Sequence, residues 1–304
     1  MPLPPLVEPG GPLTPGAHRR YARHLILDGF GDEAQRRLAA ARVLVVGAGG
    51  LGSPVLLYLA AAGVGTLGIA DADTVDETNL QRQILHGQAD LGREKVDCAR
   101  DRVLAQNPDV RVRPHPVRVH RGNALDLLDG YHLVVDASDN FTTRYLLGDA
   151  CEMLRLPHLW GAVQGFDGQV SVFWSGHGPV YRDLFPSPPH PGAAPSCGEA
   201  GILGVTCAAV GSVMATEAVK LLCGLGDPLV GRLLVFDGLA MSWRTVRARP
   251  DPDRTPVTSL DDGADGASQM HGVDGASEMH GGPGGSGTPE DHPGTEPPPA
   301  NWGA

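Results

Sequence analysis

Residues 42–52 read Arg42-Val43-Leu44-Val45-Val46-Gly47-Ala48-Gly49-Gly50-Leu51-Gly52. The four apolar residues before the glycines have no polar face, which predicts a central strand buried on both sides of a parallel sheet. Gly47, Gly49 and Gly52 have the G-x-G-x-x-G spacing, which allows a tight turn, close approach of the backbone to phosphate, and close helix–strand packing. A helical pattern then continues to about Gly63. The stretch therefore predicts a nucleotide-binding α/β fold.

The rest of the chain alternates extended and helical patterns. Further predicted strands cover 66–70, 110–119, 132–136, 159–163, 168–174, 233–236 and 243–247. Further predicted helices cover 18–27, 32–41, 93–106, 123–128, 141–154 and 205–223. Residues 165–168 read as a hairpin turn. We therefore expect a Rossmann-like, doubly wound sheet that is mainly parallel, with antiparallel strands in its C-terminal part and helices on both faces.

Polar residues follow the predicted strands at the edge where open α/β sheets bind ligands. A phosphate at the glycine turn meets free backbone N–H groups and the positive end of a helix dipole. Asp71 lies about 20 residues beyond the glycines, where a carboxylate accepts hydrogen bonds from a ribose. The polar loop 71–83 is long enough to have a function of its own. The candidate nucleotide-binding residues that this placement indicates are Gly47, Gly49, Gly52, Asp71 and Asp139.

The acidity of the chain is concentrated near its C-terminus. The 304 residues carry a net charge of -11. Residues 251–304 contain ten acidic residues and one arginine, together with eleven Gly and eight Pro. This composition predicts a disordered low-complexity tail, and the Pro-rich residues 1–17 predict a disordered N-terminus. The remaining segment, 18–250, is expected to form one domain that is close to neutral, which does not favour nucleic acid as a partner.

Targeting and cysteine patterns suggest a reduced compartment. No run approaches the roughly 20 apolar residues of a membrane span, and residues 1–15 lack a signal-peptide pattern, so we expect a cytoplasmic protein without a membrane partner. The five cysteines show no C-x-x-C spacing and are an odd number, as expected of reduced thiols. Four of them fall in helical patterns and are expected in the core. These are Cys98, Cys151, Cys207 and Cys223.

Two chemistries compete for the glycine turn. A dehydrogenase uses it for a dinucleotide, whereas an adenylating enzyme uses it for ATP and needs positive charge near the triphosphate. Arg82 and Lys95 favour ATP, because both lie near the phosphate end of the site if Asp71 holds the ribose. Two unit charges about 4 Å apart interact by roughly 4 kcal/mol at an effective dielectric near 20.

Several motifs together resemble the ThiF/MoeB/HesA family, the bacterial relatives of ubiquitin-activating enzymes. The similarity runs from about residue 18 to 250. The motifs that carry it are Arg20-Tyr21-Ala22-Arg23, Gly47-Ala48-Gly49-Gly50-Leu51-Gly52, Asp71-Ala72-Asp73, Asn79-Leu80-Gln81-Arg82-Gln83, Lys95 and Asp139-Asn140.

The resemblance implies ATP-dependent adenylation of the C-terminal glycine of a small ubiquitin-like sulfur carrier that ends in Gly-Gly, with release of pyrophosphate. Molybdopterin-synthase-type and thiamine-type carriers are the expected partners. By similarity, Asp71 holds the ribose, and Asp139 carries Mg²⁺. The residues that bind phosphates by similarity are Gly50, Asn79, Arg82 and Lys95. The same motifs add Asp73, Gln81 and Asn140 to the expected nucleotide-binding residues.

The family also implies a homodimer. Arg23 resembles the arginine that such dimers insert into the neighbouring subunit's site. The apolar helix 205–223 suits an interface or a plain core position. Cys197 matches a loop cysteine that bonds covalently to the carrier in some relatives, and an accessible loop suits a reactive thiol. Adenylation alone does not require this thiol, so its covalent role stays open.

Two features depart from the family pattern. Its two zinc-binding C-x-x-C pairs would fall at 180–183 and 254–257, where no cysteine occurs, so we expect no zinc. Some relatives continue into a rhodanese domain, whose place the acidic tail takes here, so we expect a separate sulfur donor protein.

Two other functions stay open at this stage. A nicotinamide-dependent oxidoreductase shares the glycine turn, but the chain shows no separate substrate domain. A non-catalytic carrier-binding protein shares the fold, but the joint presence of five charged candidates argues against it. These are Arg23, Asp71, Arg82, Lys95 and Asp139.

Overall fold

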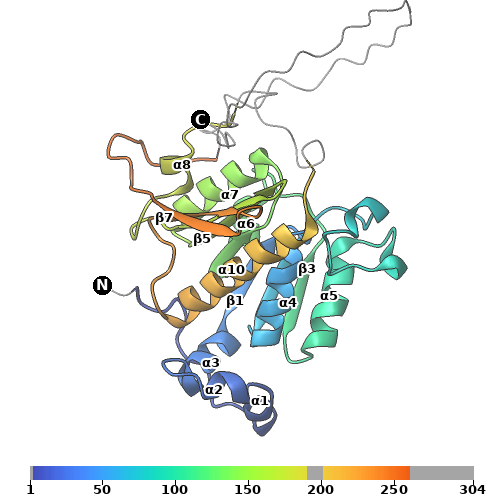
Figure 1. Cartoon of the computed structure of the whole chain (residues 1–304). Coiled ribbons are helices and arrows are strands. Elements are labelled where there is room, and N and C mark those ends of the chain that lie inside the picture. Colours follow the sequence, from blue (N-terminus) through green and yellow to red (C-terminus); the bar gives the residue numbers. More distant parts are fainter. Residues whose placement is uncertain (1–2, 190–200, 261–304) are drawn as a thin grey trace, which may run out of the picture.

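The computed structural model describes residues 3–189 and 201–260, which surround a single mixed sheet (Figure 1). The strand order in this eight-stranded sheet is β3-β2-β1-β4-β5-β6-β7-β8. The first five strands pair in parallel, and β6, β7 and β8 continue the sheet with antiparallel pairs. The strands are β1 Arg42–Val46, β2 Thr66–Ala70, β3 Arg111–His115, β4 Leu133–Asp136, β5 His158–Gln164, β6 Asp167–Phe173, β7 Arg232–Asp237 and β8 Ser242–Arg247. The predicted fold class is confirmed.

The helices cover both faces of the sheet. They are α1 Pro15–Arg20, α2 Ala22–Leu25, α3 Gly31–Ala40, α4 Gly52–Ala62, α5 Lys95–Gln106, α6 Ala124–Leu128, α7 Phe141–Leu154, α8 Tyr181–Leu184 and α10 Gly204–Cys223. Two 3₁₀ turns, Glu77–Asn79 and Gln88–Asp90, lie between β2 and α5. In Figure 1, α4, α5 and α10 lie together over one part of the sheet.

Strand β1 supplies side chains to two separate apolar cores. Val43 and Val45 join the larger core, which contains residues of α4 and α10. Leu44 and Val46 join a second core with residues of α6 and α7. Successive side chains of a strand point to opposite faces, so a strand covered on both faces needs apolar residues at every position. This alternation explains the run without a polar face at 43–46.

Helix α10 differs from the expectation that no segment is as long and apolar as a membrane span. Gly204–Cys223 is long and apolar enough to cross a membrane, by length and composition alone, although 56% of an apolar 18-residue stretch within it is buried inside the fold. Its residues Val210, Met214 and Leu221 belong to the larger core. In this fold α10 packs against α4 and β5, as a core helix does.

The N-terminal segment is more ordered than its composition suggests. Val7 is only 5% exposed, and the Leu6 N–H donates to the Leu221 carbonyl of α10 at 3.1 Å. Thr14 caps α1, since its hydroxyl accepts a hydrogen bond from the Ala17 N–H at 3.1 Å. For residues 3–17 the prediction of disorder was therefore wrong: a few aliphatic side chains suffice when a core surface is already present.

The predicted helix 18–27 is broken at Tyr21. This residue leaves the helical conformation (φ -100°, ψ 16°) and lies between α1 and α2. Its side chain is 7% exposed, and its hydroxyl accepts a hydrogen bond from Asn107 Nδ2 at 2.8 Å. Burial of one aromatic ring therefore overrides the local helical pattern.

Other boundaries shift for local reasons. Strand β3 ends at His115 rather than at residue 119, because the Val117 N–H turns back onto the His115 carbonyl. Helix α8 lies between the predicted strand 168–174 and the predicted helix 205–223, where the sequence analysis predicted no helix. The hairpin turn predicted at 165–168 does connect β5 and β6.

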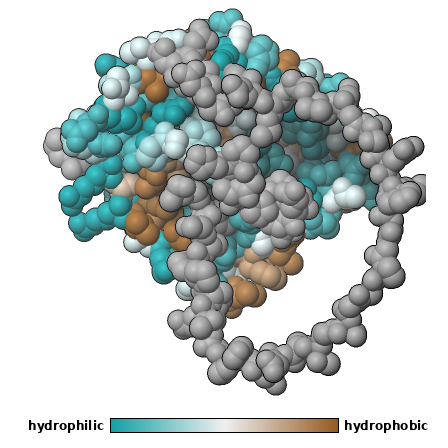
Figure 2. Space-filling model, turned by 90° about the horizontal axis from the view of Figure 1, so that it is seen from above, coloured by the Kyte–Doolittle hydropathy of each residue, from teal (hydrophilic) through white to brown (hydrophobic). Residues whose placement is uncertain are grey.

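The C-terminal part of the sheet is less covered. Residues 243–247 of β8 are exposed, and several large apolar side chains near the β7–β8 hairpin face solvent. The most exposed are Leu239 and Met241, each at 76%. Seen from above, the surface is mostly hydrophilic with separate apolar patches (Figure 2).

Five charged residues join the segments where the family's zinc cysteines would fall. We call Asp149, Glu152, Arg182, Asp183 and Arg254 the ion-pair clasp. Arg254 donates to Asp183 at 2.8 Å and to Glu152 at 2.7 Å. Arg182 donates to both carboxylate oxygens of Asp149, at 2.5 and 2.8 Å. The clasp therefore ties residues 251–257 to α7 and α8.

The predicted tail consequently begins too early. Residues 251–260 are described and contact the domain, and Leu260 is only 9% exposed. Residues 261–304 lie outside the described part of the chain. The absence of zinc stays a prediction. Within residues 3–189 and 201–260, no group of three or more His, Cys, Asp or Glu side chains lies close enough to hold a metal ion.

Candidate functional site

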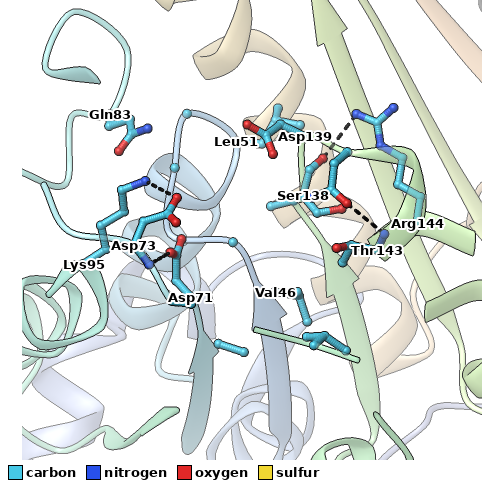
Figure 3. Close-up of a pocket in the computed structure, with 18 of the residues that line it drawn as sticks. Val46, Leu51, Asp71, Asp73, Gln83, Lys95, Ser138, Asp139, Thr143 and Arg144 are labelled. Atoms are coloured by element: carbon cyan, nitrogen blue, oxygen red, sulfur yellow. Dashed lines mark hydrogen bonds and ion pairs between the residues drawn. The ribbon is translucent and has the colours of Figure 1, made fainter. Parts of the chain in front are cut away.

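A cleft with a volume of about 180 Å³ opens where β1, β2 and β4 end. The glycine loop after β1 forms its floor, and the residues after β2 and β4 form its sides (Figure 3). The predicted residues that line it are Gly47, Gly49, Gly50, Asp71, Asp73, Arg82, Lys95, Asp139 and Asn140. The tertiary structure thus brings together segments from 47 to 140 in one site.

The glycines of the loop are required by space as well as by conformation. Gly47 has φ +98°, and a Cβ there would lie 2.7 Å from the Ala137 carbonyl oxygen. A Cβ on Gly52 would lie 1.9 Å from the Gly47 carbonyl oxygen. Gly52 does not line the cleft, and its role is the close packing of α4 against the turn. The first and last glycines therefore shape the loop.

Two side chains that the sequence analysis missed fix the loop carbonyls. Ser53 donates its hydroxyl to the Gly49 carbonyl at 2.6 Å. His86 is 5% exposed, and its Nε2 lies 2.9 Å from the Ala48 carbonyl, so this nitrogen carries the proton. Burial lowers the pKa of His86, which favours the neutral ring. Because Ser53 and His86 hold these two carbonyls by hydrogen bonds, the loop is preorganised for a ligand.

Asp71 joins the glycine loop to the loop after β2. Its carboxylate accepts hydrogen bonds from the Ala48 N–H at 2.8 Å and the Asp73 N–H at 2.9 Å. Burial raises the pKa of Asp71, while the nearby Lys95 ammonium opposes that shift. The side chain of Asp71 follows β2 and lines the cleft, and its ribose role stays a prediction.

Lys95 extends into the cleft from the start of α5. Its side chain is 7% exposed, and its Nζ lies 3.0 Å from Asp73 Oδ2. The Asp73 carboxylate is 58% exposed, so water screens the pair and its contribution to stability is about 0–1 kcal/mol. An incoming phosphate can therefore compete with Asp73 for the ammonium.

Arg82 has only neutral partners among the described residues. It donates to the Asn79 side-chain oxygen and to the Thr78 carbonyl, each at 3.2 Å. Asn79 also accepts from Gln83, which lines the cleft. Asn79 thus orients its neighbours without lining the cleft itself. Gln81 is exposed and does not line the cleft, so this predicted binding residue lies outside it.

The turn after β4 is held by a buried network. Asp136 is fully buried, and its Oδ1 accepts from the Ser138 N–H at 3.0 Å and from the Ser138 hydroxyl at 2.6 Å. His158 Nε2 lies 3.2 Å from the other carboxylate oxygen. Asp139 follows, exposed at the cleft, and Asn140 caps α7 through the Thr143 N–H at 2.9 Å. The network fixes the direction in which Asp139 is presented.

The cleft also contains two arginines that sequence reasoning missed. Arg118 lies beyond β3 and is exposed, whereas Arg144 lies on α7 and is 5% exposed. Arg144 donates to the Ser138 carbonyl at 3.2 Å (Figure 3). The sequence offered one indication that Arg144 faces the cleft: it lies one helical turn after Asn140, and residues i and i+4 share a helix face.

The remaining predicted site residues lie elsewhere. Arg23 is exposed on α2 and does not line the cleft of its own chain. Cys197 lies outside the described residues. The other four cysteines are buried, as predicted, and Cys207 reaches the cleft: a Cβ on Gly50 would lie 2.8 Å from its sulfur.

Comparison with known proteins shows which family has this sequence. The model of the ThiF family matches residues 21–257, most of the chain.

The chain belongs to the ThiF family.

Among curated ThiF relatives, the probable adenylyltransferase/sulfurtransferase MoeZ of Mycobacterium tuberculosis is 55% identical over 264 residues, covering 86% of this chain and 67% of that protein. The sulfur carrier protein adenylyltransferase of Thermus thermophilus is 53% identical over 243 residues, covering 78% of this chain and 89% of that protein. Among solved structures, Escherichia coli MccB with ATP has a TM-score of 0.66 at 17% identity, over 74% of this chain and 69% of that one. This last likeness concerns the fold alone.

Proposed function

We propose that this ThiF member activates the C-terminal glycine of a small ubiquitin-like sulfur carrier by ATP-dependent adenylation. The supporting observation is that a preformed glycine loop, the ribose-type carboxylate of Asp71 and the cations Arg82 and Lys95 share one cleft. Two curated relatives are named as adenylyltransferases, and one of them is named for sulfur carrier proteins.

The reaction joins two anions, so charge stabilisation is the main task of the site. An oxygen of the glycine carboxylate bonds to the α-phosphorus, the bond to the bridging oxygen of the β-phosphate breaks, and pyrophosphate leaves with the electron pair. Lys95 and Arg82 lie where they can stabilise the charge on the departing pyrophosphate. The glycine loop holds the phosphates by its N–H groups, while Asp71 fixes the ribose.

Magnesium is part of the proposal. Mg²⁺ commonly uses one or two carboxylates together with substrate phosphates, rather than a cage of protein ligands. Asp139, exposed at the cleft, fits as such a single carboxylate, and the described residues contain no larger acidic cluster that would compete. A bound Mg²⁺ would offset phosphate charge.

A protein substrate suits the exposed surface better than a small molecule does. Leu239, Met241 and Trp243 are exposed apolar side chains in or beside the β7–β8 hairpin, and exposed apolar surface of this kind favours a protein contact. We propose molybdopterin-synthase-type or thiamine-type carriers, a cytoplasmic location and a separate sulfur donor, without membrane or nucleic acid. Cys197→Ser is expected to keep adenylation, since the reaction above uses no thiol.

The decisive experiment is ATP–pyrophosphate exchange with each candidate carrier that ends in Gly-Gly, followed by intact-mass detection of the adenylate. Carrier-dependent exchange supports the proposal, and no exchange with any such carrier contradicts it. Preference for NAD(H) over ATP would favour an oxidoreductase. ATP binding without turnover on any carrier would favour a non-catalytic carrier-binding protein.

A homodimer in which Arg23 completes the neighbouring site completes the proposal. Arg23→Ala is expected to bind ATP yet lose turnover. If Arg23 acts in the neighbouring site, a mixed dimer of one Arg23→Ala chain and one Arg82→Ala chain carries both defects in one site and leaves the other site intact. Co-expression should therefore restore about a quarter of wild-type turnover. Absence of any restoration argues against action across the interface.

A further inference from the structure

Arg144 is a buried cation that lacks a carboxylate partner among the described residues. Its side chain is 5% exposed, and no described Asp or Glu oxygen lies within ion-pair distance. Among the described residues its guanidinium donates one hydrogen bond, to the neutral Ser138 carbonyl at 3.2 Å. Its Nε has no partner in the described part of the chain. A guanidinium has five N–H donors, so most of its capacity is unused.

The surroundings of Arg144 do not compensate for its charge. The guanidinium lies over the Phe141 ring at 5.3 Å and the Trp160 ring at 5.9 Å. Such contacts offset only part of the free-energy cost of removing a charge from water. Arg182 in the ion-pair clasp, which packs against the same helix, shows the alternative: it makes two bonds to Asp149. An unpaired arginine as buried as Arg144 therefore indicates an anion that arrives with a ligand.

The position of Arg144 identifies which anion. Arg144 lines both the nucleotide cleft and a small aromatic pocket. Figure 3 shows Lys95 and Asp73 on one side of the cleft, with Ser138, Asp139 and Arg144 on the other. Lys95 and Arg82 serve the phosphates in the proposed function. A further cation across the cleft lies where the second anionic reactant must approach.

We propose that Arg144 binds the C-terminal carboxylate of the carrier and positions it for attack on the α-phosphate. This inference rests on the proposed function. Planar guanidinium and carboxylate groups match in a bidentate pair, which fixes orientation as well as charge. Arg144 also offsets the repulsion between the incoming carboxylate and Asp139, which lies on the same side of the cleft. The Ser138 carbonyl, held through Asp136, keeps the guanidinium in place.

A double-mutant cycle tests this contact directly. The probe is a carrier that supports pyrophosphate exchange, prepared with a C-terminal acid and with a C-terminal amide. Its binding is measured in the presence of a non-hydrolysable ATP analogue. The wild-type protein is expected to bind the acid about tenfold or more tightly than the amide, as charged hydrogen bonds allow. In Arg144→Gln this preference should disappear, with ATP-analogue affinity within about twofold of wild type.

Two further variants keep the test decisive. Arg144→Lys keeps the charge but not the bidentate geometry, so it should retain only part of the preference for the acid, and an undiminished preference overturns the inference. Arg118→Gln removes an exposed cation from the same cleft and is the matched comparison. Loss of the acid preference in Arg118→Gln, with the full preference kept in Arg144→Gln, also overturns it.

The outcomes separate this inference from the proposed function. If wild type supports exchange and amidation weakens wild type and Arg144→Gln equally, Arg144 is not the carboxylate anchor, although adenylation stands. If no carrier supports exchange with wild type, the proposed function fails, and the inference fails with it.

Discussion

The nucleotide cleft and the ion-pair clasp use the same residue types in opposite ways. In the clasp, both arginines are bonded to carboxylates at 2.5–2.8 Å. In the cleft, Arg82 and Arg144 bond only to neutral oxygens of the described residues. Lys95 has a carboxylate partner, but that carboxylate is 58% exposed.

This difference distinguishes cations that stabilise the fold from cations that are available to bind a ligand. A charge whose hydrogen bonds are satisfied within the chain contributes to stability, and removal of one partner leaves a buried charge alone. A charge with unused donors has capacity for a substrate, at some cost to the free protein. The sequence contains 22 arginines. Only their partners in the folded chain distinguish the two groups.

The largest expected effect is at Arg82. Arg82→Ala removes a cation that serves the departing pyrophosphate, so carrier-dependent exchange should fall by about 100-fold or more. The free energy of unfolding should change by less than about 0.5 kcal/mol, because the side chain has no ionic partner to leave behind. Exchange kinetics and urea unfolding measure the two effects. A large loss of stability would place Arg82 with the clasp instead.

Arg254 should show the reverse behaviour. Arg254→Ala leaves Glu152 and Asp183 without their shared cation, and both carboxylates are at most 6% exposed. The expected loss is about 3 kcal/mol in the free energy of unfolding, with the exchange rate of the folded protein within about twofold of wild type. Arg232→Ala is the control, since its partner Asp227 is 86% exposed and the expected loss is below about 1 kcal/mol. Equal losses in both variants would contradict the role of the clasp.

Ionic strength should affect the two regions differently. At about 0.1 M salt, charges separated by more than about 10 Å in water are largely screened, whereas buried pairs are screened much less. Raising salt should therefore weaken ATP binding several-fold while the free energy of unfolding changes little. Titration calorimetry and denaturant curves across a salt series provide the measurement. Parallel changes in both quantities would mean that the clasp is as open to solvent as the cleft.

The smallest expected effect concerns pH and the cleft. Because burial lowers the pKa of His86 below 6.5, the unfolded chain binds a proton below about pH 6.5 that the folded chain does not. The free energy of unfolding should therefore fall as pH drops from 7 towards 5. His86→Gln keeps a donor for the Ala48 carbonyl and should show a shallower pH dependence. The same slope in variant and wild type would exclude His86 as a source of acid sensitivity.

The local part of the site could be read from the chain. The glycine loop, Asp71, Arg82, Lys95 and Asp139 were found because each follows a strand or matches a family motif. His86 and Ser53 were missed because they donate hydrogen bonds to backbone carbonyls of the loop, and no sequence spacing predicts such contacts. Gln81 was placed in the site because its neighbours belong there, although it is exposed outside the cleft.

The two ends of the domain also could not be predicted from local sequence. Composition predicted disorder for residues 1–17 and a tail from residue 251. Leu6 nevertheless bonds to α10, and Arg254 bonds to α7 and α8. Composition describes what a segment can do alone, whereas these segments are ordered by surfaces built from distant residues.

The sequence by itself determined the mainly parallel sheet with antiparallel strands in its C-terminal part, the glycine turn and the resemblance to the ThiF family. These depend on periodicity and on short motifs between residues 20 and 140. Only the tertiary structure decided which charged groups are satisfied. Val43 needs no partner beyond an apolar environment, so its pattern suffices. Carboxylates of α7 and α8 reach Arg254, whereas no described carboxylate forms an ion pair with Arg144, and that difference is a property of the folded chain.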